Sequence, residues 1–230
     1  MKKTVVLLIV SLLMALACAG YFFYRFNVFE ASEYRMEDFG IDRIKSTVDF
    51  NQNGMDDYED FLIGARKDAE NKPTYDGSYV VGGYPPDDKG VCTDVIWRAF
   101  KQAGYNLREM VDLDIHEHQA DYGIAKIDNN IDFRRVGNLH VYFNRYAESL
   151  TNDIAEIEAF QPGDIVIFDN DRHIGMVSDK RNSEGKPYII HNEGKTRREE
   201  DYLKRNKNIT AHFRFDAGKI DSKYLVRWED

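Results

Sequence analysis

The feature that most constrains this chain is an uncharged and mostly apolar run close to its N-terminus. After Met1-Lys2-Lys3 the sequence reads TVVLLIVSLLMALACAGYFFY, from Thr4 to Tyr24. A helix over this run would be roughly 30 Å long, which matches the hydrocarbon core of a bilayer. The lysines before the run and the lone Arg25 after it favour a cytoplasmic N-terminus and an exported remainder. We therefore expect a single-pass cell-membrane protein whose body lies outside the cytoplasm.

Three alternatives to a retained anchor stay open. Ala15-Leu16-Ala17 has the form of a signal-peptide cleavage site, which would release a secreted protein. Cys18 could be the acylated residue of a lipoprotein, although Ala15 stands where that motif usually has leucine. The run continues through Phe22-Phe23, which favours an uncleaved anchor. The remaining alternative is a buried structural helix, and it alone would not export the body.

Composition limits what the remainder can do. The formal net charge is -9, which argues against nucleic acid as a partner and against charge-driven docking on anionic lipid. Hydrophobic residues make up 43% of the chain, enough for a sizeable core. We divide the sequence into an anchor at 1–25, a lead-in at 26–73 and a domain at 74–230.

The order of the predicted elements indicates an α+β fold, with helices packed on an antiparallel sheet. Helical spacing of apolar residues is clearest in CTDVIWRAFKQAG, where Gly104 is the expected stop. Further helices are predicted over 61–72, 107–118 and 138–150. Short apolar runs bounded by turn residues then predict strands over 164–169, 173–179, 188–192, 209–215 and 224–230.

Cys92 is a candidate nucleophile. The spacing places it at the N-terminus of the predicted helix, where the macrodipole and free N–H groups are expected to lower the pKa of a thiol. Its one possible intramolecular partner, Cys18, lies in the anchor run, so Cys92 is expected to be unpaired in an oxidising compartment. The alternative is an inert buried cysteine.

A catalytic cysteine also needs a base, usually a histidine that a third polar group orients. His173 begins one predicted strand and His191 ends the next, with a turn-rich loop centred on Asn182 between them. In an antiparallel pair the two histidines would then lie opposite each other, with Cβ atoms roughly 5 Å apart. A register change of one residue would bring Asn192 there instead. Either histidine alone could be an ordinary hydrogen-bonded polar residue.

The segments GVCTDVIWRAFKQAGY, FRRVGNL, QPGDIVIFD, DRHIGMVSD, IIHNEG and ITAHFRF together resemble a family of exported bacterial proteins known only as a domain of unknown function. That family belongs with the NlpC-type, papain-like cysteine peptidases and amidases. The resemblance covers about residues 75–215. In that clan a helix-start cysteine is followed by a PGD strand, an H-[IV]-G-I strand and a strand that ends in I-H. This chain departs from the pattern in the longer spacing between its histidines and in the long 104–160 insertion.

The resemblance implies a papain-like fold and a triad of Cys92 as nucleophile, His173 as base and His191 as the third residue. It also implies hydrolysis of amide bonds, with cell-wall peptide as the leading substrate and no cofactor for catalysis. Thioester or ester chemistry on the same triad, as in acyl transfer or lipid hydrolysis, is one alternative. A catalytically silent wall-binding module is another.

Two further groups of residues are candidates for the site. Tyr75, Tyr79 and Tyr84 precede the nucleophile and could line a cleft, donate to an oxyanion or simply pack. The run DFNQNGMDDYED resembles an EF-hand loop and predicts a weak structural Ca²⁺ site, the alternative being a solvated turn that caps the next helix. Its expected ligands are Asp49, Asn51, Asn53, the carbonyl of Met55, Asp57 and Asp60.

Overall fold

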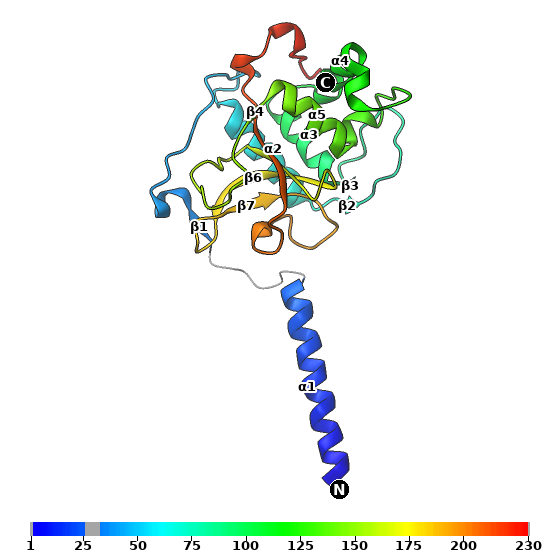
Figure 1. The fold of residues 1–230 in the computed structure, drawn as a ribbon, viewed down its shortest axis with the longest axis vertical. Coiled ribbons are helices and arrows are strands. Elements are labelled where there is room, and N and C mark those ends of the chain that lie inside the picture. The colour runs from blue at the N-terminus through cyan, green and yellow to red at the C-terminus, as the bar shows by residue number, and fades with distance from the viewer. Residues whose placement is uncertain (1, 26–32, 230) are drawn as a thin grey trace.

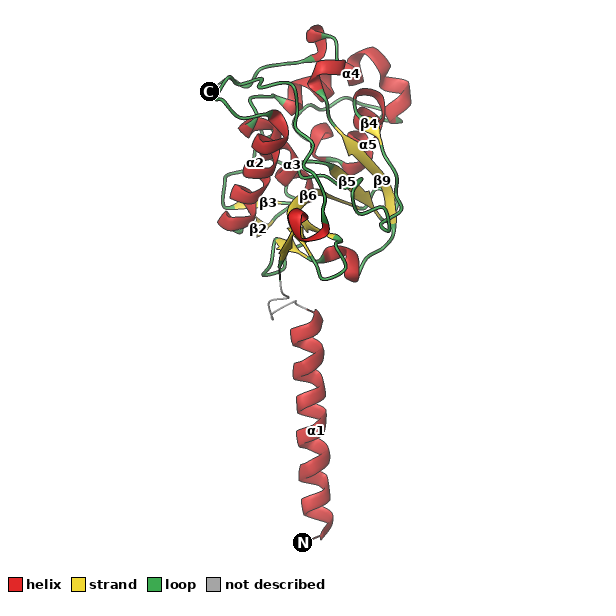
Figure 2. Ribbon diagram, turned by 90° about the vertical axis from the view of Figure 1, so that its left-hand side faces the viewer, coloured by secondary structure: helices red, strands yellow, loops and turns green. Residues whose placement is uncertain are grey.

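The computed structural model describes residues 2–25 and 33–229. Helix α1 (Lys2–Arg25) stands apart from the folded body in both views (Figure 1, Figure 2). Its apolar window Lys3–Phe23 has a mean hydropathy of 2.6, and none of that window is buried. The alternative of a buried structural helix is therefore wrong. α1 is a candidate membrane anchor or signal sequence.

The body is a mixed α+β structure built on an antiparallel sheet. The strand order is β4-β9-β5-β6-β7-β8, and β1 lies beside the far end of β6. The strands are β1 (Tyr34–Arg35), β4 (Glu148–Ser149), β5 (Ile165–Phe168), β6 (His173–Arg181), β7 (Pro187–Ile190), β8 (Glu199–Glu200) and β9 (Ile209–Arg214). A separate parallel pair consists of β2 (Thr74–Tyr75) and β3 (Lys89–Gly90).

Helices cover one face of this sheet. They are α2 (Asp57–Asn71), α3 (Cys92–Gln102), α4 (Leu107–Tyr122) and α5 (Val136–Tyr146), with the 3-10 turn η2 (Asp132–Arg134) between α4 and α5. The other 3-10 turns are η1 (Met36–Phe39) before α2, η3 (Tyr202–Lys204) between β8 and β9, and η4 (Ala217–Lys219) and η5 (Ser222–Tyr224) after β9. α2 and α3 pack closely where Gly64 meets Ala99. A Cβ at Gly64 would lie 2.7 Å from the Ala99 backbone, so this approach requires glycine.

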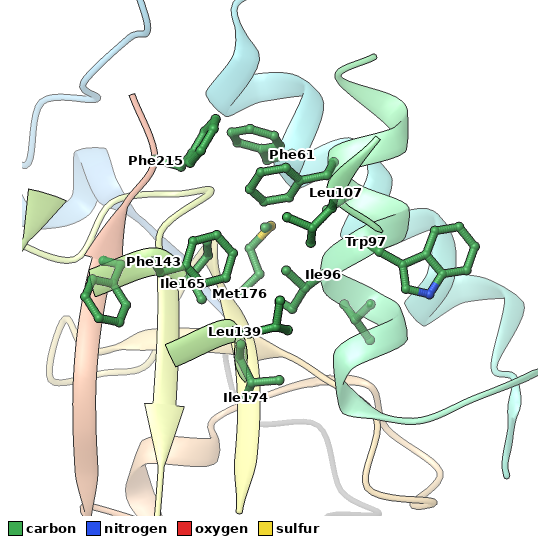
Figure 3. Packing of buried hydrophobic residues seen from close by; sticks show 14 of the residues in the cluster. Phe61, Ile96, Trp97, Leu107, Leu139, Phe143, Ile165, Ile174, Met176 and Phe215 are labelled. Atoms are coloured by element: carbon green, nitrogen blue, oxygen red, sulfur yellow. The ribbon is translucent and has the colours of Figure 1, made fainter. Parts of the chain in front are cut away.

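Both faces of the sheet are buried. On the helical face, Ile174 and Met176 of β6 meet Ile96 of α3 within the main core (Figure 3). On the opposite face, Val177 packs with Tyr202 in a second, smaller cluster. Successive residues of β5 therefore enter different clusters, which explains why this strand reads as a continuous apolar run.

The predicted helices and the first four predicted strands of the C-terminal third are confirmed, except that the helix predicted over 138–150 ends at Tyr146 and Glu148–Ser149 form β4. The strand predicted over 224–230 is wrong. Tyr224 instead ends the turn η5. The chain after it runs along the end of α3, where the Trp228 N–H donates to the Gly104 carbonyl at 2.8 Å and Tyr105 pairs with Arg227 as an isolated bridge. Its apolar side chains therefore cover the helices and do not extend the sheet.

Candidate active site

Cys92 is the first residue of α3, as the sequence predicts. The preceding Val91 is extended, and its N–H donates to the side chain of Asp94 at 2.7 Å. The carboxylate of Asp94 also accepts from the Trp97 indole at 2.7 Å. These contacts hold the first turn of the helix and so fix the position of the thiol.

Asp94 forms a buried ion pair that sequence reasoning missed. The Arg134 guanidinium binds both carboxylate oxygens, at 2.8 and 2.9 Å, and both side chains are almost fully buried. Arg134 also donates to the Ser78 carbonyl at 3.2 Å, and its own carbonyl accepts from the Thr93 hydroxyl at 3.1 Å. The FRR segment, quoted above only for its resemblance, therefore ties η2 and the loop around Ser78 to the helix that carries Cys92.

The thiol of Cys92 faces the sheet beside the residue that follows His173. The residue is 6% exposed, and the backbone N–H of Ile174 lies close enough to its sulfur to favour the thiolate. Burial raises the pKa of the thiol to about 11, against the opposing effect of that N–H. The expectation that the helix N-terminus lowers this pKa is therefore wrong, because desolvation of the thiolate outweighs the nearby dipoles. Within the described residues no hydrogen bond joins Cys92 to His173.

The two histidines contact each other on the face of the sheet that carries the smaller cluster with Tyr202, opposite the helices. His173 Nε2 and His191 Nδ1 are 2.8 Å apart, and the rings are nearly perpendicular. The register differs from the predicted one by two residues, since Met176 pairs with Ile190 and Val177 with Ile189. A shift of two leaves both side chains on the same face, so the predicted contact forms diagonally between neighbouring strands.

Two carboxylates complete this cluster, and neither was predicted. His191 Nε2 lies 3.1 Å from Oε1 of the buried Glu200 on β8. Glu193 Oε1 lies 3.9 Å from His173 Nε2 and accepts from the Tyr202 hydroxyl at 2.7 Å. Burial and, after it, the neighbouring His191 lower the pKa of His173 to about 3, so His173 is neutral at pH 7.

Asn192, the reserve candidate for orienting the base, does not take that place. Its amide donates to the Gly90 carbonyl at 3.0 Å, and its side-chain oxygen accepts from the Gly194 N–H at 2.9 Å. The observed register turns Asn192 to the other face of the sheet from His173. Asn192 therefore holds the strand that leads into Cys92, and its assignment as an orienter of His173 is wrong.

The three tyrosines before Cys92 have different surroundings. Tyr84 packs between Trp97 and Trp228, which fits the packing alternative. The Tyr79 hydroxyl donates a hydrogen bond to Asp128 Oδ2 at 3.1 Å. Tyr75 is 53% exposed, and the pKa of its hydroxyl is raised by burial and by the nearby Cys92 and Glu193. Tyr75 is thus the tyrosine that borders the candidate site.

The predicted calcium loop folds around Asp60. The side-chain amides of Asn51 and Asn53 both donate to its carboxylate at 2.9 Å, and Asp49 accepts from the Gly54 N–H at 2.8 Å. These four side chains, with the carbonyl of Met55 nearby in the chain, stay candidate ligands. Asp57 does not, because it is buried and accepts from Phe50 N–H at 2.9 Å and from the Tyr105 hydroxyl at 2.6 Å.

Among the described residues, His173, His191 and Glu193 form the one group of histidine, cysteine and acidic side chains whose ligand atoms lie within 4.8 Å of one another. The arrangement suits hydrogen bonding better than a cation. The two ring nitrogens face each other at 2.8 Å, and Lys195 already pairs with Glu193 at 2.5 Å. A metal ion would have to separate the rings and approach that lysine.

Comparison with known proteins places the chain in a family. A domain family described as "Domain of unknown function (DUF1287)" matches residues 62–215. The uncharacterized protein YijF of Escherichia coli (strain K12) is 36% identical over 163 residues, which cover 66% of this chain and 78% of that protein. No solved structure matches the chain significantly. The chain is therefore a member of the DUF1287 family.

Proposed function

We propose that this protein is an exported cysteine hydrolase of the NlpC-type, papain-like clan that cleaves amide bonds. The support is the arrangement of its parts. A cysteine opens a helix that packs on an antiparallel sheet, and two neighbouring strands of that sheet supply histidines in contact. The order along the chain, Cys92, then His173, then His191, is the order that the resemblance implies.

The observation that carries the proposal is the proximity of the Cys92 sulfur to the backbone N–H of Ile174, which is close enough to act on the pKa of the thiol. It brings the thiol to the residue next to His173, at the start of β6. In uncomplexed enzymes a catalytic hydrogen bond is often long or poorly aligned and tightens only when substrate binds. His173 and Ile174 are neighbours at the start of β6 and point to opposite faces of the sheet, so we propose that the thiol and the His173 ring meet beyond this end of the strand when substrate binds.

The proposed reaction is acyl transfer to sulfur. As the sulfur of Cys92 attacks the amide carbonyl, its proton passes to Nδ1 of His173, and a C–S bond forms. The imidazolium then gives this proton to the departing amine as the C–N bond breaks. Water, deprotonated by His173, attacks the thioester and releases the acid with the free thiol. Backbone N–H groups at the start of α3 are the candidate donors to the oxyanion.

The raised pKa of the thiol decides how Cys92 is activated. With a pKa of about 11 for Cys92 and of about 3 for His173, the resting groups are a neutral thiol and a neutral imidazole, not an ion pair. His173 therefore acts as a general base during attack, as a histidine does for serine. Such a site is expected to react slowly with small electrophiles and faster with a bound substrate.

We propose cell-wall peptide as the substrate, on the resemblance alone. Thioester or ester substrates would use the same residues, and activity on them is the first alternative. The burial of Cys92 favours a second candidate function, a wall-binding module with no catalysis, because a neutral thiol at 6% exposure is also what an inert cysteine looks like.

Digestion of purified muropeptides by the full chain in detergent micelles, followed by mass spectrometry, separates these functions. We expect new peptide termini with the wild type and none with Cys92→Ala or His173→Ala. His140→Ala is the matched control, because His140 is a partly exposed histidine bonded to Asp171 and lies outside the site. Cleavage of thioester or lipid ester alone selects the alternative chemistry. Binding to wall fragments without cleavage of any of these substrates overturns the hydrolase proposal.

We further propose that the body acts outside the cytoplasmic membrane and that α1 tethers it there. The support is the exposed apolar helix and the lysines that precede its apolar run. The intact mass of the mature protein tests this. A retained anchor leaves the chain at full mass, whereas cleavage after Ala17 or acylation of Cys18 changes the mass by a defined amount.

A further inference from the structure

We propose that Glu200 is a positioning residue that fixes the proton positions on both histidines, so that the lone pair of His173 Nδ1 is free to accept the thiol proton. The catalytic consequence rests on the function proposed above. The proton positions themselves follow from the contacts of three side chains. They can be measured whether or not the protein turns out to be an enzyme.

Glu200 is an ionised carboxylate in a buried place. It is 2% exposed, on β8, where it pairs across the sheet with Ile189 of β7. Burial raises its pKa, but the hydrogen bond and charge of His191 and then the charge of Arg205 bring it down to about 2. Arg205 binds the same oxygen, Oε1, that faces His191. An ionised carboxylate can only accept hydrogen bonds.

The carboxylate of Glu200 determines which nitrogen of His191 carries a proton. His191 Nε2 lies 3.1 Å from Oε1, so Nε2 must carry the hydrogen. In its neutral form His191 has one N–H, and its Nδ1 then has a lone pair. That nitrogen faces His173 Nε2 at 2.8 Å.

The second proton follows from the first. Since His191 Nδ1 accepts, His173 Nε2 must donate, and His173 Nδ1 is left with its lone pair. A carboxylate orients the base of a Ser-His-Asp triad in the same way, there through one ring and here through two. When His173 accepts the thiol proton, the positive charge that forms lies at the end of a hydrogen-bonded chain that leads to a carboxylate.

Glu193 does not provide the same control. It approaches the nitrogen of His173 that already bonds to His191, and at 3.9 Å from Nε2 it is beyond hydrogen-bond distance. Its carboxylate is engaged by Tyr202 at 2.7 Å and by Lys195 at 2.5 Å. Glu193 supplies negative charge near His173, whereas Glu200 determines which nitrogens carry protons.

The direct test is long-range ¹H–¹⁵N NMR of the full chain in micelles with ¹⁵N-labelled histidine, assigned with His173 and His191 variants. We expect both rings to be protonated on Nε2 only at pH 7. Glu200→Leu removes the acceptor and should bring a proton onto His173 Nδ1 in a substantial fraction of molecules. Glu200→Gln keeps an oxygen facing Arg205 and His191, so it should keep the wild-type pattern. Glu199→Gln is the matched control, since the Glu199 carboxylate binds Arg66 and Ser178.

Activity gives a second measurement. If the wild type turns over substrate, Glu200→Leu should lower kcat by up to about 10⁴-fold with little change in KM, the scale of loss seen for a mis-set tautomer. Glu200→Gln should lose much less. A wild-type spectrum with a proton on His173 Nδ1 overturns the proposal even if Glu200→Leu fails to fold, and so does a folded Glu200→Leu with unchanged spectrum. Absence of turnover with the expected spectrum leaves this inference standing and counts against the hydrolase alone.

Discussion

Replacing Arg134 with methionine should destabilise the folded body by about 3–5 kcal/mol, because the change leaves a buried carboxylate without its counter-charge. The Arg134 side chain is 1% exposed and that of Asp94 is fully buried. Two charge-assisted hydrogen bonds, at 2.8 and 2.9 Å, are lost together. Methionine keeps most of the apolar stem of arginine, so packing changes little and the loss reports mainly on the charge.

Thermal unfolding of the full chain in micelles measures this. For a body of this size the loss corresponds to a Tm lower by roughly 6–20 °C. The double variant Asp94→Asn/Arg134→Met removes both charges and should recover at least ~2 kcal/mol relative to the sum of the single variants. Glu148→Gln is the control, since it breaks an exposed pair with Lys219 and should change stability by less than ~1 kcal/mol. A Tm within 2 °C of wild type for Arg134→Met would refute the reasoning.

Three other predictions test the ionisable groups. Alkylation of Cys92 by iodoacetamide, in a Cys18→Ser background, should be slow at pH 7 and rise steeply from pH 9 to 11; a plateau already below pH 8 contradicts the raised thiol pKa. The pKa of Asp57 is raised mainly by burial to about 6, so the folded state binds more protons than the unfolded state between pH 4 and 6. Unfolding by urea should therefore show stability falling as pH rises through this window, by up to ~3 kcal/mol, and Asp57→Asn should flatten the profile. Millimolar Ca²⁺ should raise Tm relative to chelator in the wild type but not in Asp60→Ala; no shift in the wild type counts against the calcium site.

Local patterns predicted most of the fold. In α3, Ile96 and Phe100 recur at helical spacing, and the helix ends just before Gly104. The segment around Leu225 and Val226 has the same apolar character as the true strands, yet it lies along the helices. A strand-like composition indicates that a segment is extended and half-buried. Only the tertiary structure decides whether it packs in the sheet or against the helices.

The sequence predicted the part of the site that depends only on which face of the sheet a side chain takes. His173 and His191 meet although the register is shifted by two, because any even shift keeps both on one face. Glu200 was not predictable, since it comes from another strand and no local motif marks it. The sequence also led to the wrong direction for the shift in the pKa of the Cys92 thiol. A helix N-terminus is visible in a sequence, whereas the depth at which it is buried is not.

Two of the three carboxylates that the sequence did not predict have one property in common that bears on function. Asp94 and Glu200 are both buried, and each binds an arginine. Buried ion pairs are weak contributors to stability, since well-packed apolar residues in their place are often neutral or stabilising. A requirement for stability alone therefore does not explain charges at these two positions. One carboxylate anchors the helix turn that carries the thiol, and the other binds the histidine next to the proposed base. The chain thus places its buried charge where it positions the two halves of one candidate site.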